Sequence, residues 1–157
     1  MKTDLTDRIF ELKNQSDFLE TALEIFEYQY LNNSVYQMFT DSLGVKWKSV
    51  DTLQGIPFLP VEFFRNHKIV TGDSTAEIVF ESSGTTGATP GRHFVNDLSL
   101  YRSSFLNSFR LFYGDPEDYL ITALLPSYSE RKGSSLVYMV DNLIKRSHNR
   151  HSGFYKN

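Results

Sequence analysis

The chain has 157 residues, a length typical of one domain, and 40% of them are hydrophobic and 15% aromatic. Its formal net charge of −3 at pH 7 excludes the strongly basic surface on which non-specific nucleic-acid binding depends. It has no cysteine, which excludes disulfides, thiolate metal sites and a cysteine nucleophile within these residues.

The chain carries no sequence signal for a membrane or for secretion. No run approaches the roughly 20 apolar residues of a membrane span. The opening stretch, "MKTDLTDRIFELKNQ", is too charged to hold the apolar core of a secretory signal. We therefore expect a cytoplasmic protein with no membrane span.

Residues 1–45 are expected to form a helical segment. Ser16 or Asp17 can cap a helix in which apolar residues recur at helical spacing as far as Tyr30. A second helix is predicted within "NSVYQMFTDSLG", with Gly44 at its C-terminal end. Its inward face is expected to carry Val35, Met38, Phe39 and Leu43.

The stretch "DTLQGIPFLPVEFFRNHKIV" reads as a buried connection into a short helix or strand. Pro57 and Pro60 keep its backbone extended. Its apolar residues exceed what a solvated linker needs, and they are Ile56, Phe58, Leu59, Val61, Phe63 and Phe64.

Residues 46–157 are expected to be a βαβ-type region of the same domain, which gives an α/β fold. "EIVFES" predicts a short strand, and Asp97 can cap a helix that Gly114 and Pro116 end. "YLITALLP" is typical of a buried parallel strand, and "GSSLVYMVDNLIKR" of a second helix. The core stripe of the first helix is expected to be Leu98, Tyr101, Phe105, Phe109 and Phe112.

The parallel sheet predicted in this way is incomplete. The last residues, "HNRHSGFYKN", give no sign of a further strand. We therefore expect either a fragment or a sheet edge that a partner covers, and two copies can pair through such an edge.

The loop after the first predicted strand, "FESSGTTGATPG", combines glycines with hydroxyl side chains. Glycines let backbone N–H groups come close to a ligand, and serine and threonine hydroxyls donate hydrogen bonds. Both suit phosphate oxygens, although the pattern is neither a Walker A nor a GxGxxG motif. A flexible Ser/Gly/Thr loop without a ligand is the alternative.

The order of residues in this loop adds a resemblance. "SSGTTG", followed shortly by a proline and a basic residue, resembles the phosphate-binding loop of the adenylate-forming enzymes. Together with "IPFLPVEFFRNHKI" and "LLPSYSERKGSSLVYMV", it is similar to LuxE-type acyl-protein synthetases, relatives of phenylacetate-CoA ligase. The resemblance runs from about residue 50 to the end. One extra residue precedes Pro90, and Arg92 is nearest to the place of the usual lysine.

The resemblance implies the front part of an adenylate-forming large domain, with ATP and Mg²⁺ as cofactors. Such enzymes join a carboxylic acid, such as a fatty acid, to AMP and pass the acyl group to a thiol on a protein cysteine or a carrier. The phosphates would be held by Ser82, Ser83, Gly84, Thr85, Thr86 and Gly87, with Arg92 as the cation.

A second group of implied site residues follows the predicted strand "YLITALLP". Tyr128, with Ser129 and Arg131 nearby, takes the place of residues that line the acyl pocket in many members of the superfamily. The alternative is a charged surface turn. His93, next to the loop, is expected to be structural or exposed, and the spacing of His148 and His151 is not expected to mark a metal site.

No catalytic residue can be assigned within this chain. Family members are longer, and their ribose-binding motif, lid lysine and acceptor cysteine lie outside the region of resemblance. We therefore expect little or no ligase activity from the chain alone. Two other hypotheses stay open, namely a truncated module that binds nucleotide or a partner without turnover, and an assembly unit that dimerises.

Overall fold

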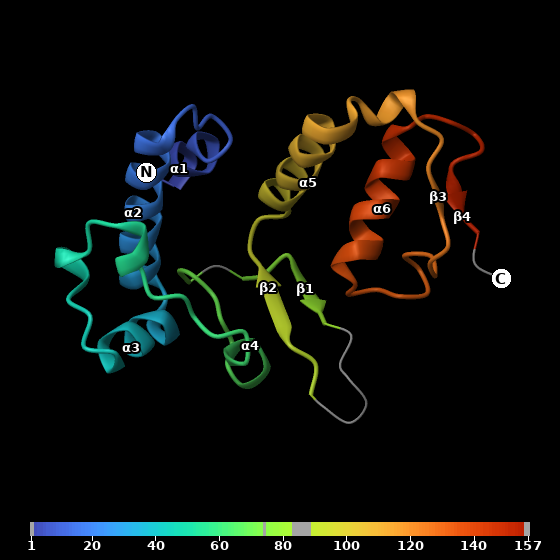
Figure 1. Ribbon diagram of the computed structural model, residues 1–157. Helices are drawn as coiled ribbons and strands as arrows, with labels where there is room; N and C mark the ends of the chain where they lie inside the picture. Colours follow the sequence, from blue (N-terminus) through green and yellow to red (C-terminus); the bar gives the residue numbers. More distant parts are fainter. Residues whose placement is uncertain (1, 74, 83–88, 156–157) are drawn as a thin grey trace. The chain divides into compact units, whose positions relative to one another are not determined.

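The computed structural model describes residues 2–73, 75–82 and 89–155 (Figure 1). Helices and short strands are mixed along the chain, which confirms the α/β class. The chain divides into two compact units: unit 1 is Met1–Thr75 with Gly91–Phe94, and unit 2 is Ala76–Pro90 with Val95–Asn157. No helix within the described residues is long and apolar enough to cross a membrane.

Unit 1 is built around the long helix α2, which packs against α3. Phe26, Tyr30 and Tyr36 are its buried aromatic residues, and the ring of Phe26 meets that of Tyr36 edge-on at 6.1 Å. The helices of this unit are α1 (Lys2–Arg8), α2 (Gln15–Asn32), α3 (Ser34–Ser42), η1 (Trp47–Ser49), η2 (Leu53–Gly55) and α4 (Phe63–Asn66).

The N-cap of α2 is Asn14, so the sequence-based choice of Ser16 or Asp17 was wrong by two or three residues. The Asn14 side chain accepts a hydrogen bond of 2.9 Å from the backbone N–H of Asp17. An amide oxygen caps as well as a hydroxyl or a carboxylate. Ser16 and Asp17 therefore lie inside the first turn, where an acidic side chain favours the helix dipole.

We expect Asn14→Ala to lower the free energy of unfolding by about 1 kcal/mol, because a backbone N–H of α2 loses its acceptor. Urea unfolding followed by the fluorescence of Trp47, which lies in unit 1, measures the change. Ser16→Ala is the matched control, and it should cost little because alanine favours helix interiors. A larger loss for Ser16→Ala than for Asn14→Ala would contradict this assignment of the cap.

The buried face of α3 differs from the predicted one. Tyr36 and Thr40, one turn apart, are its buried residues, whereas Met38 is 63% and Leu43 55% exposed. The hydroxyl of Tyr36 donates to the carbonyl of Pro57 at 2.6 Å. Tyr36, whose buried ring carries a hydrogen-bonded hydroxyl, thus takes the inward position that was predicted for Met38. Gly44 follows the helix with a φ of 70°, as its predicted role requires.

The connection after α3 contains the predicted short helix, α4, but it is less buried than expected. Phe58 is 81% and Val61 72% exposed, while Ile69 is buried. The ring of Phe63 packs on that of Phe39 at 5.4 Å. Some apolar side chains of this stretch therefore pack within unit 1, whereas others stay exposed.

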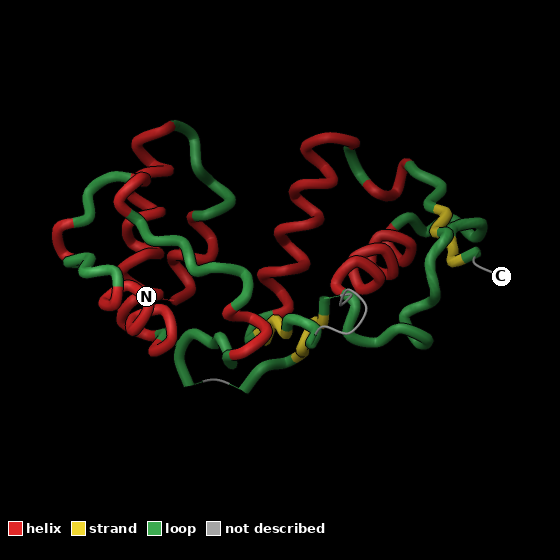
Figure 2. The backbone as a smooth tube through the Cα atoms, turned by 60° about the horizontal axis from the view of Figure 1, so that its bottom comes forward, coloured by secondary structure: helices red, strands yellow, loops and turns green. Residues whose placement is uncertain are grey.

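The strands form two separate two-stranded sheets, β1 with β2 and β3 with β4. The elements are β1 (Ile78–Glu81), β2 (Arg92–Val95), α5 (Leu98–Tyr113), η3 (Pro116–Asp118), β3 (Thr122–Ala123), α6 (Ser135–Arg146) and β4 (Gly153–Phe154). The two predicted strands, in β1 and β3, therefore do not share a sheet. The parallel pair is β3 with β4, which makes β3, α6 and β4 a βαβ unit (Figure 2).

The end of the chain contributes a strand that the sequence did not reveal. Thr122 pairs with Gly153 and Ala123 with Phe154 in parallel register. Only two residues of each strand pair, which is too short a run for a periodic signal. In β3, buried Ala123 follows exposed Thr122, so the apolar run containing it is covered on one face rather than two.

The core of unit 2 lies between α5 and α6. Asp97 caps α5 as predicted, its carboxylate accepting from the backbone N–H groups of Ser99 and Leu100. Phe112 was wrongly assigned to the core, because it is 77% exposed, and Leu106 is buried instead. The cluster consists of Phe105, Leu106 and Leu143, packed against Tyr101, Phe109, Ile121, Tyr138 and Met139.

Candidate functional site

Strand β1 directly precedes the glycine- and hydroxyl-rich loop in the chain. Phe80 is 5% exposed, whereas Glu81 and Ser82 are exposed. The backbone N–H of Glu81 donates to the carbonyl of Gly133 at 2.8 Å. Gly133 has a φ of 90°, a backbone conformation that glycine adopts without strain. The last residue of β1 is thereby held beside the chain that enters α6.

The start of α6 suits an anion. Ser134 is its N-cap, and its hydroxyl accepts from the backbone N–H of Val137 at 3.4 Å. The first turn holds no acidic residue. The positive end of the helix dipole is therefore not neutralised by a carboxylate of its own. Anions bind favourably at such helix ends.

An aromatic cluster supports both the end of β1 and the start of α6. The Phe80 ring lies 5.3 Å from Tyr101 and 5.7 Å from Tyr138, between ring centroids. The Tyr101 hydroxyl donates to the carbonyl of Ser135 at 3.0 Å, and burial raises the pKa of this phenol. Tyr128 adds its ring to that of Tyr138 at 5.8 Å. The packing thus fixes two backbone segments relative to each other within unit 2.

The predicted phosphate-binding residues are only partly described. Ser83, Gly84, Thr85, Thr86 and Gly87 lie outside the described residues. Ser82 is exposed directly after β1. Arg92 is the first residue of β2, and its guanidinium carbon lies 5.6 Å from the centroid of the Phe94 ring, within unit 1. The predicted cradle therefore stays a prediction.

The second predicted group forms a turn with its own hydrogen bonds. The Ser127 hydroxyl donates to the Glu130 carboxylate at 2.6 Å and lies 2.9 Å from the Ser129 hydroxyl. The backbone N–H of Arg131 donates to the Ser127 carbonyl at 3.1 Å. Ser129 and Arg131 are exposed, whereas Tyr128 is half-buried. The Tyr128 ring thus reaches β1 only indirectly, through the Tyr138 ring that also packs on Phe80.

The histidines take structural or surface positions. His93 lies in β2 with its ring 5.7 Å from that of Phe64, and desolvation lowers the pKa of its imidazole. His148 follows α6 and its Nε2 lies 3.8 Å from a carboxylate oxygen of Glu117. Among residues 2–73, 75–82 and 89–155, no group of three His, Asp or Glu side chains is placed to hold a metal ion.

Sequence reasoning missed the contribution of Gly133 and Ser134. The signal was present, because "KGSS" places a glycine and a suitable N-cap directly before a predicted helix. What the sequence could not show was the long-range backbone bond from Glu81 to Gly133, which brings this helix start to the end of β1.

Part of the chain is similar to a bacterial ligase. Over 63 residues, which are 40% of this chain, 38% are identical to the long-chain-fatty-acid–luciferin-component ligase of Vibrio harveyi. The aligned stretch spans 16% of that ligase. No protein-family model and no solved structure matches the chain. The similarity is to a fatty-acid ligase and covers a minor part of both proteins.

Proposed function

We propose that this chain is the N-terminal part of an ATP-dependent ligase that activates a fatty acid as its acyl-adenylate. The observation that carries the proposal is the "SSGTTG" sequence, set at the exit of a strand whose last residue is bonded beside a helix start. The partial similarity to a bacterial fatty-acid ligase supports the same chemistry. Such an enzyme would belong to the acid–thiol ligases and need ATP and Mg²⁺.

The donor types around the end of β1 fit polyphosphate. Ser82 supplies a hydroxyl, and α6 supplies a helix start free of acidic residues in its first turn. Glu81 is an exposed carboxylate, a ligand type that Mg²⁺ accepts. Ser83, Thr85, Thr86 and the loop glycines would complete the cradle.

In the proposed reaction, a carboxylate oxygen of the acid attacks the α-phosphorus of ATP and pyrophosphate leaves. A thiol sulfur then attacks the acyl carbon of the adenylate and AMP leaves. The residues of this chain would take no proton in either step. Their part would be to orient the phosphates and to offset negative charge on the departing pyrophosphate, which is an electrostatic form of catalysis.

A second candidate is a module that binds nucleotide or a partner without turnover. It stays open because this chain contains no cysteine and so cannot itself hold the acyl group as a thioester. The acceptor thiol of the proposed ligase would therefore lie on another protein, on a carrier or on residues beyond this sequence.

Two measurements test the proposal and separate the candidates. Calorimetry of the 157-residue chain with Mg·ATP is expected to give saturable binding, and the protein expressed from its complete gene is expected to catalyse fatty-acid-dependent ATP–pyrophosphate exchange. Binding without exchange would favour the module that does not turn over. Absence of both would overturn the assignment of the loop to nucleotide.

A further inference from the structure

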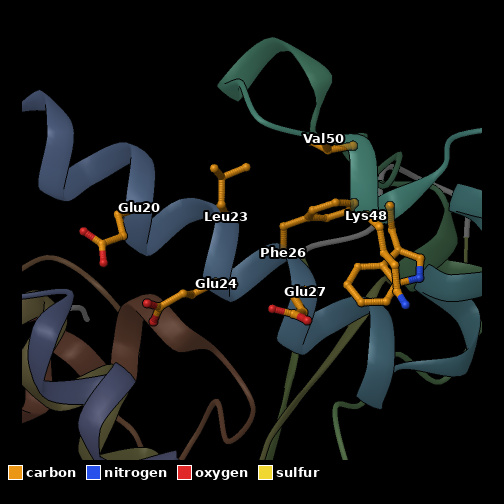
Figure 3. Close-up of a pocket in the computed structure, with 8 residues that line it drawn as sticks. Glu20, Leu23, Glu24, Phe26, Glu27, Lys48 and Val50 are labelled. Carbon is orange, nitrogen blue, oxygen red and sulfur yellow. The ribbon is translucent and has the colours of Figure 1, made fainter.

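A groove in unit 1 is lined by none of the residues assigned to the proposed ligase chemistry. It has a volume of about 460 Å³, which falls in the range of ligand sites, and it lies between α2 and residues 47–50 (Figure 3). Its apolar lining is Leu23, Phe26, Trp47 and Val50, and its charged lining is Glu20, Glu24, Glu27 and Lys48.

The three glutamates form a row on one face of α2. Their spacing of four and then three residues places them on successive turns, so the row is about 10 Å long at ~1.5 Å per residue. Three carboxylates face two cations, Lys48 in the lining and Arg8 beside Glu20 and Glu24, which leaves the groove with an excess of one negative charge. A fatty-acid carboxylate or a phosphate would be repelled here, whereas a positively charged group would be attracted.

Two cations of this chain already contact the groove, one at its carboxylates and one at its tryptophan ring. On α1, Arg8 places Nη1 2.7 Å from an oxygen of Glu24 and Nη2 4.0 Å from an oxygen of Glu20. The Lys48 ammonium lies 5.3 Å from the centroid of the Trp47 ring, a cation–π distance. The side chains of Glu20 and Glu24 stay 69% and 39% exposed. Carboxylate surface is therefore left for a further cation.

We propose that this groove binds a basic segment of a partner protein that also carries an apolar side chain. The apolar side chain would contact Leu23, Phe26 and Val50, and lysine or arginine side chains would pair with Glu20 and Glu27. A segment fits better than a small amine, because the carboxylates extend along α2 instead of converging on one point. The binding proposed for this groove does not depend on the proposed ligase activity.

The single tryptophan of the chain makes the proposal directly measurable, because Trp47 lines the groove. We expect a short synthetic peptide of lysines and leucines to change the fluorescence of Trp47 saturably, with binding that weakens as salt is raised. A peptide with glutamate in place of lysine should leave the signal unchanged. Absence of any change with the lysine peptide up to millimolar concentration would overturn the proposal.

A double variant, Glu20→Gln with Glu27→Gln, tests the row of carboxylates. We expect affinity for the lysine peptide to fall at least tenfold with an unchanged circular dichroism spectrum. Glu11→Gln with Glu62→Gln, two exposed positions of unit 1 outside the groove, is the matched control and should bind as the unmodified chain does. Equal binding by both double variants would contradict the proposal.

Two other occupants are distinguished in the same experiments. Butylammonium binding as tightly as the peptide would replace the partner segment with a small amine. Self-association in sedimentation that the Glu20→Gln, Glu27→Gln variant abolishes would replace it with a second copy of this chain. Either outcome would overturn the partner-protein assignment.

Discussion

Replacing both Thr85 and Thr86 by alanine is expected to lower fatty-acid-dependent ATP–pyrophosphate exchange by at least about 100-fold, measured on the protein expressed from its complete gene. The expectation follows from the proposed function, in which these hydroxyls donate to phosphate oxygens as charge builds on the leaving pyrophosphate. Loss of one such preorganised donor typically costs about two to three orders of magnitude in rate.

The matched control is Ser104→Ala, which removes a hydroxyl from an exposed position of α5. It should leave exchange unchanged. Calorimetry of the short chain adds a readout that does not depend on turnover, since the threonine pair should also weaken Mg·ATP binding. Full exchange by the double variant, with nucleotide bound as before, would remove the loop from the proposed site.

The sequence predicted those elements whose signals are local. Asp97 was recognised as the cap of α5, and Gly44 and Gly114 as helix ends, because capping depends on a few neighbouring residues. The strand at Ile78–Glu81 and the helix at Ser135–Arg146 were found from their apolar patterns.

Two of the failures concern choices that depend on tertiary contacts, and one concerns a local choice between helix caps. Asn14 caps α2 although Ser16 was an equally good local candidate. Phe112 continued the apolar stripe of α5, yet the covered face of the helix turns toward Leu106. Strand β4 forms from a glycine and a phenylalanine that pair with distant Thr122 and Ala123. The faces of α5 and the pairing of β4 depend on residues distant in the sequence, whereas the Asn14 cap is a local bond whose preference over Ser16 the structure does not explain.

The candidate site divides in the same way. Its loop was found from residue order alone, because "SSGTTG" needs no partner to be recognised. Its support was not found, because that support consists of the bond from Glu81 to Gly133 and of rings drawn from β1, α5 and α6. The chemistry assigned to the loop thus stays a prediction from residue order, whereas the contacts that support the end of β1 were visible only in the structure.

Phe80 is a buried residue of the aromatic cluster that supports the end of β1. We expect Phe80→Ala to lower the free energy of unfolding of unit 2 by about 3–5 kcal/mol, since it removes a 5% exposed ring that packs against Tyr101 and Tyr138 and leaves a cavity. Urea unfolding followed by far-ultraviolet circular dichroism measures the loss. Phe112→Ala, which truncates a 77% exposed ring in the same unit, should change stability by at most about 0.5 kcal/mol.

The effect of Phe80→Ala on nucleotide binding distinguishes a role in positioning the start of the loop from a role in stability alone. Because Phe80 precedes the backbone bond from Glu81 to Gly133, its loss should weaken Mg·ATP binding even in conditions where unit 2 stays folded. Phe80→Leu keeps much of the apolar volume and should restore most of both properties. If Phe80→Ala cost no more stability than Phe112→Ala, the packing of β1 on the tyrosines would not hold the start of the loop. Nucleotide binding would then have to depend on the loop residues alone.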